Sequence, residues 1–163
     1  MSATGDVVFI GYQSGKRARG TGNTGLGYRA LYGADSTAAN NTGTYNTAIG
    51  QNALKWFSKT VGSTAVGAEA GYYTTGSYNS FFGYKAGHGG TTSAPYSSGT
   101  SNVAIGYKAL TGFTTGYGNT AVGTETLDAV TEGFYNIGIG PAAGGSITTG
   151  DYNIAIGYAA FDA

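Results

Sequence analysis

The sequence predicts an all-β protein, a parallel β-solenoid (β-roll) of about nine 17-residue coils. Two observations carry this prediction: one short motif recurs along the whole chain, and no segment keeps a helical periodicity for long. The composition agrees, because 31 of the 163 residues are glycine and only 10% are charged. A disordered chain has the opposite balance, with high charge and few aromatic residues.

The repeated motif reads Asn-x-Ala-(Ile/Val)-Gly, as in residues 46–50. Successive closing glycines are 16, 17 or 23 residues apart, so the period is 17, with about six residues inserted twice. We therefore expect residues 1–163 to form a single β-solenoid repeat domain. Its units close at the anchor glycines Gly11, Gly27, Gly50, Gly67, Gly83, Gly106, Gly123, Gly140 and Gly157.

The residues before each anchor glycine predict a short strand. A bulky Ile, Val, Leu or Phe precedes the glycine, and Thr, Ser, Val or Ile lies two residues earlier. These two side chains share one face, because side chains alternate along a strand. We expect that bulky face to point into the coil. The residue between them is Ala or Gly in seven units, with Phe9 and Phe81 as exceptions, and we expect this small face to pack against other chains.

The rest of each unit predicts turns. Asn lies four residues before the anchor glycine in seven units, where it suits a turn and a hydrogen-bonded stack of asparagines. The residues after the glycine, such as Tyr107 to Leu110, predict a second short strand or a corner. A Thr-Thr-Gly turn often follows, as at residues 114–116.

Two motifs resemble known repeat families. Residues 101–106 (Ser-Asn-Val-Ala-Ile-Gly) resemble the head repeats of trimeric autotransporter adhesins. Residues 118–123 (Gly-Asn-Thr-Ala-Val-Gly) and 107–110 (Tyr-Lys-Ala-Leu) resemble arrays in fibre and virion-surface proteins of tailed bacteriophages, cyanophages among them. Both resemblances imply a homotrimer. A single-chain solenoid is the competing architecture.

The departures from the adhesin pattern favour a phage protein. The 17-residue unit is longer than that of the adhesin heads, and the first residues have no basic flank and no long apolar stretch of an export signal. We expect a structural virion-surface protein (fibre, spike or capsid decoration), made in the host cytoplasm, with recognition of a host-surface glycan as a further role. The alternative is the head of a trimeric adhesin on a bacterial cell surface. A glycan-active enzyme and an ice-binding solenoid are less favoured.

The expected partners are other copies of the chain, other virion proteins and host-surface polysaccharide. Nucleic acid is not expected, since Lys16, Arg17 and Arg19 form the only basic cluster. Membrane insertion is not expected either, because no apolar run approaches the ~20 residues that span a bilayer. All eight Lys and Arg lie within residues 1–108, a distribution that arises by chance or marks an end that faces an acidic partner.

Catalytic chemistry has little support in the sequence. The chain has no cysteine, and His88, its one histidine, lies in a glycine-rich tract. The acids are scattered, so no zinc ligand set is evident. We expect no enzymatic activity, no cofactor and no metal site.

Binding residues are expected at the insertions and along the tyrosine rows. Loops that leave a solenoid often collect on a binding face. The tyrosine rows form either stacked ladders or a sugar-binding surface. The loop candidates are Tyr32, Asp35, Asn40, His88, Pro95 and Tyr96. The aromatic-surface candidates are Tyr45, Tyr78, Tyr84, Tyr107, Tyr135 and Tyr152.

Overall fold

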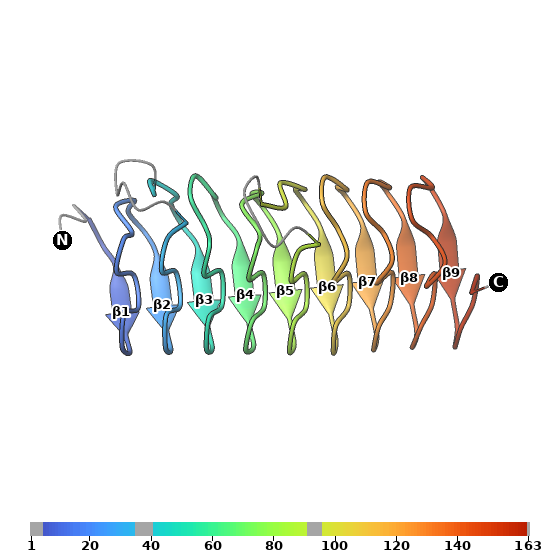
Figure 1. Ribbon diagram of the computed structural model, residues 1–163, viewed down its shortest axis with the longest axis horizontal. Coiled ribbons are helices and arrows are strands. Elements are labelled where there is room, and N and C mark those ends of the chain that lie inside the picture. The colour runs from blue at the N-terminus through green and yellow to red at the C-terminus, as the bar shows by residue number, and fades with distance from the viewer. Residues whose placement is uncertain (1–4, 35–40, 91–95, 163) are drawn as a thin grey trace.

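The computed structural model describes residues 5–34, 41–90 and 96–162. These residues contain no helix, and nine three-residue strands form one sheet in which each strand pairs in parallel with the next (Figure 1). The arrangement confirms the predicted all-β parallel solenoid, with one strand directly before each anchor glycine. The strands are β1 (Val8–Ile10), β2 (Thr24–Leu26), β3 (Thr47–Ile49), β4 (Thr64–Val66), β5 (Ser80–Phe82), β6 (Val103–Ile105), β7 (Thr120–Val122), β8 (Ile137–Ile139) and β9 (Ile154–Ile156).

The register follows the motif through the whole sheet. Ala48 in β3 pairs with Ala65 in β4, and the flanking positions pair in the same order. The two 23-residue spacings do not shift this register, since Thr24 pairs with Thr47 and Ser80 pairs with Val103. The two insertions therefore leave the pairing of the flanking strands unchanged.

The prediction of the buried strand face was wrong. The middle residue of the strand is the one that points into the coil, and Ala48 and Phe81 are fully buried. The bulky residue before the anchor glycine is outside, with Ile49 37% and Ile105 42% exposed. The small residue is inside because the coil is narrow, so a strand side chain meets the corner of its own coil. The bulky residues form a row that we name the outer aliphatic row, although one member, Phe82, is aromatic. It is made up of Ile10, Leu26, Ile49, Val66, Phe82, Ile105, Val122, Ile139 and Ile156.

Core side chains from the strand and from the corner complement each other in size. The corner residue is the fourth after the anchor glycine, and Leu54 and Leu110 fill it in coils whose strand carries Ala48 and Ala104. In the coil that contains Phe81 the corner is Gly87, and a Cβ there would overlap the Phe81 ring. Coils three, five and six thus fill the same part of the core with different residues, as close packing demands.

The segment after the anchor glycine is a corner, not a second strand, in every described coil. In the third coil Gly50, Asn52 and Leu54 all have positive φ, at 127°, 59° and 45°. Glycine is required at the first of these positions because its Cβ would lie 2.6 Å from the carbonyl oxygen of Gly67 in the next coil.

The expected asparagine stack is confirmed. Asn119 is fully buried, and its Nδ2 donates to the carbonyl of Gly133 at 2.8 Å. Its Oδ1 accepts the backbone N–H of Asn136 at 2.9 Å, and the same bond recurs between neighbouring asparagines along the rod. Ser63 substitutes in the fourth coil, where its Oγ accepts the N–H of Asn79 at 3.1 Å. The stack satisfies buried backbone groups that the short strands leave unpaired.

Candidate functional site

Six aromatic rings contact one another along one side of the solenoid, over coils two to five. They are partly exposed, and we name them the aromatic platform. Five of them are the fifth or sixth residue after an anchor glycine, so the stacking of coils places them side by side. The sixth lies at the end of the second insertion. The platform comprises Tyr32, Trp56, Tyr72, Tyr73, His88 and Tyr96.

Trp56 joins the flanks of the two insertions. Its ring stacks on Tyr96 with centroids 5.6 Å apart and planes 22° apart, and it meets Tyr32 edge-on at 6.4 Å. Tyr96 also stacks on Tyr73 at 5.8 Å. Tyr32 and Tyr96, which are more than sixty positions apart in the chain, therefore lie on the same side of the rod.

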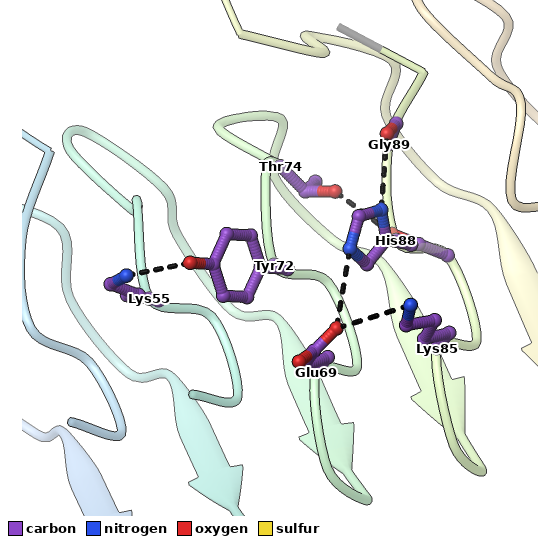
Figure 2. A network of polar contacts seen from close by, with 8 residues as sticks. Lys55, Glu69, Tyr72, Thr74, Lys85, His88 and Gly89 are labelled. Carbon is purple, nitrogen blue, oxygen red and sulfur yellow. Dashed lines mark hydrogen bonds and ion pairs between the residues drawn. The ribbon is translucent and has the colours of Figure 1, made fainter. Parts of the chain in front are cut away.

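A buried cation lies against two rings of the platform. The Lys55 side chain lies between the rings of Trp56 and Tyr72, with Nζ 4.7 Å from each centroid. Nζ donates a 2.6 Å hydrogen bond to the Tyr72 hydroxyl (Figure 2). Lys55 is only 8% exposed, and no carboxylate within the described residues forms an ion pair with it. Two cation–π contacts and one phenol oxygen hold the ammonium group in place of a counter-ion.

A carboxylate lies next to His88, at the end of the platform opposite to Tyr32. Glu69 Oε2 is 3.5 Å from Lys85 Nζ and 3.6 Å from His88 Nε2 (Figure 2). The His88 ring stacks on Tyr72 at 5.3 Å and 11°. Burial lowers the pKa of His88, so its ring is neutral at pH 7. Burial also raises the pKa of Tyr73, with further contributions from Tyr72 and Tyr96.

The tyrosines that follow anchor glycines form short ladders beside the sheet. Tyr84 and Tyr107 stack at 5.7 Å and 17°, and both are more than 40% exposed. Lys85 and Lys108 lie over these rings at 5.4 Å and 5.1 Å. Neither Tyr84 nor Tyr107 has a ring contact with a residue of the platform.

The tyrosines that precede the asparagines cover glycines of the preceding coil. A Cβ on Gly118 would lie 2.6 Å from the Tyr135 ring, so the glycine makes space for the ring. Tyr135 contacts Tyr152 at 5.5 Å. Together with Tyr117 and Phe134 these rings form a second, smaller cluster. The glycine–tyrosine pairs are Gly22 with Tyr45, Gly62 with Tyr78 and Gly118 with Tyr135.

The structure brings together only part of the expected binding set. Of the loop candidates, Tyr32, His88 and Tyr96 belong to the platform, while Asp35, Asn40 and Pro95 lie outside the described residues. None of the six tyrosines proposed as an aromatic surface has a ring contact with the platform. Sequence reasoning missed Lys55, Trp56, Tyr72 and Tyr73. Aligning the units on their anchor glycines provides the signal, because Tyr32, Tyr72 and His88 share the fifth position.

The described residues contain no group of three or more histidines and acids placed to hold a metal ion. No helix in that part of the chain is long and apolar enough to cross a membrane. Comparison with protein-family models, with curated proteins and with solved structures finds no significant match. The likeness to phage and adhesin repeats therefore rests on the motif residues themselves.

Proposed function

We propose that this chain is a structural protein of a tailed-phage surface, a fibre, spike or capsid decoration, whose aromatic platform binds polysaccharide on the host. The observation that carries the binding role is the platform itself. Six contacting, partly exposed rings with phenol and imidazole groups offer flat apolar faces for sugar rings and polar edges for hydroxyls.

The rest of the molecule supports a role as a stiff spacer. Nine stacked coils, spaced by ~4.8 Å, give a rod on the order of 45 Å long. The asparagine stack, with Ser63 in one coil, ties coils two to nine together, and five of the six platform residues are on coils that it connects. A rigid platform loses little conformational entropy when it binds a ligand.

The outer aliphatic row supports self-association. Ile49, Phe82 and Ile105 are 37%, 41% and 42% exposed, and with the half-buried Val66 between the first two they follow one another along a single face of the sheet. A continuous exposed apolar stripe of this kind marks an interaction surface. We propose that three copies cover it by packing their sheets around a common axis; the number three comes from the family resemblance.

The binding role is tested by measuring the affinity of the chain for polysaccharide extracted from host cells. Trp56→Ala and Tyr73→Ala are each expected to weaken binding about two- to tenfold, because a stacked ring contributes about 0.5–1.5 kcal/mol. Tyr158→Ala is the matched control, since Tyr158 is 84% exposed and makes no ring contact within the described residues. If both platform variants bind like the unsubstituted chain, the platform is not the contact surface.

The phage assignment needs a separate experiment. Immunogold labelling with an antibody raised against this chain is expected to mark the surface of phage particles. Label on the outer membrane of uninfected cells would instead favour the adhesin head.

A further inference from the structure

Three cations converge on one ring at the N-terminal end of the platform. The guanidinium Cζ atoms of Arg17 and Arg29 lie 4.7 Å and 5.5 Å from the Tyr32 centroid, and Lys16 Nζ lies 5.8 Å from it. Arg29 Nε donates to Gln13 Oε1 at 2.8 Å, which is a neutral partner. Three positive side chains thus surround one phenol.

Within residues 5–34, 41–90 and 96–162, none of the three has a carboxylate partner. The ion pairs of the described residues are those of Glu69 and Glu125, and they lie in later coils. Like charges held close together repel, and the cluster has a positive electrostatic potential. A bound anion would reduce the repulsion between the three cations. An arginine fork binds a carboxylate or a sulfate through two parallel hydrogen bonds.

The cation cluster is continuous with the platform. Tyr32 meets Trp56 edge-on at 6.4 Å, so the cations lie directly beside the stacked rings. At the opposite end Glu69 supplies a carboxylate next to His88. The platform therefore runs from a strongly positive end to an end that accepts hydrogen bonds from hydroxyl groups.

Resting on the proposed polysaccharide binding, we propose that the platform recognises an acidic polysaccharide, one whose sugars carry carboxylates or sulfates. The sugar rings stack on Trp56 and Tyr96, and an acid group binds Arg17 and Arg29. The Glu69 carboxylate accepts hydrogen bonds from sugar hydroxyls, which a glycan carries on most of its ring carbons and a DNA strand lacks along its length; this favours a glycan over an oligonucleotide.

The test compares four defined probes by affinity measurement at low and high salt. Polygalacturonate carries carboxylates, dextran sulfate carries sulfates, dextran is neutral, and an oligothymidylate represents nucleic acid.

Two variants are measured with each probe: the double variant Arg17→Gln/Arg29→Gln and the single variant Trp56→Ala. Arg19→Gln is the matched control, because Arg19 is an exposed cation of the same coil without a ring contact within the described residues. Circular dichroism confirms that each variant keeps its fold.

We expect at least one acidic polysaccharide to bind about tenfold or more tightly than dextran, and to weaken as salt rises. The double arginine variant should lose most of that preference, and Arg19→Gln should retain it. Binding to polygalacturonate alone identifies a carboxylate site, and binding to dextran sulfate alone identifies a sulfate site. Either result supports the inference.

Three outcomes overturn the inference. If dextran binds as tightly as the acidic polysaccharides, and only Trp56→Ala weakens glycan binding, the platform binds glycans without preference for acidic ones. The proposed function then stands. If oligothymidylate binds as tightly as the acidic glycans, the site recognises polyanions in general. If no glycan binds, the inference and the proposed binding role both fail.

Discussion

Single residues in this rod are fixed by contacts with the next coil. Gly50 has φ 127°, and the space beside its Cα is occupied by the backbone of Gly67. Asn119 is fully buried; its backbone N–H donates to Asn102 Oδ1 in the preceding coil, and its own Oδ1 accepts the backbone N–H of Asn136 in the next coil. A substitution at either position therefore disturbs the stacking of coils rather than the conformation of one coil alone.

The anchor glycines provide a test that separates backbone strain from steric overlap. Gly157 has a similar φ, 119°, but nothing lies within 4 Å of the position of its Cβ. Gly157→Ala is expected to destabilise the fold by about 1–3 kcal/mol, from strain alone. Gly50→Ala should cost clearly more, because its Cβ would lie 2.6 Å from a carbonyl oxygen. Urea unfolding measures both, and equal losses would show that the overlap relaxes freely.

The asparagine stack is tested at Asn119. Asn119→Ala removes the acceptor for the N–H of Asn136 and the donor to the carbonyl of Gly133. Two buried backbone groups are left unpaired, so the free energy of unfolding should fall by about 2–5 kcal/mol. Asn119→Ser should lose less, because Ser63 already accepts such a bond in the fourth coil. An alanine variant as stable as the serine variant would contradict this role of the stack.

Strand and corner side chains complement each other in size in successive coils five and six. Phe81 on β5 lies against Gly87, whereas β6 carries Ala104 and its corner carries Leu110, both fully buried. The two combinations occupy the same site in successive coils. Leu110 adopts φ 52°, close to the 56° of Gly87, so leucine fits the corner backbone.

Exchanging one combination for the other tests this complementarity. Phe81→Ala should cost about 3–5 kcal/mol, because it opens a cavity in the core. Gly87→Leu should also be destabilising, since its side chain overlaps the Phe81 ring. The double variant reproduces the Ala104–Leu110 combination and should be more stable than either single variant in a double-mutant cycle. Additive losses would mean that strand and corner pack independently.

The sequence predicts the strands and their register because both depend on the spacing of the anchor glycines. It does not predict the buried face, since Ala48 and Ile49 are both apolar and alternation alone does not say which one points inward. The buried Leu54 side chain at the corner fills the narrow interior, so only a small strand residue such as Ala48 fits beside it. The platform depends on contacts between Trp56 and Tyr96, which only the stacked coils bring together.

At the scale of the whole molecule, the two sides of the rod have different properties. The sheet carries the outer aliphatic row, whereas the side with the platform carries rings and cations. No platform residue lies in a strand, so the association proposed above would leave the platform free to bind a ligand. Three copies would then present three platforms, and several weak glycan contacts would combine into firm attachment.

Sedimentation equilibrium of the purified chain tests assembly through the sheet most directly. The unsubstituted chain is expected to have a mass near three times 16.4 kDa. Ile105→Asp places a charge on the outer aliphatic row and should give a folded monomer, whereas Ala104→Asp buries an unpaired carboxylate and should prevent folding. A folded, monomeric unsubstituted chain, or a trimer that Ile105→Asp leaves intact, would contradict the proposed interface.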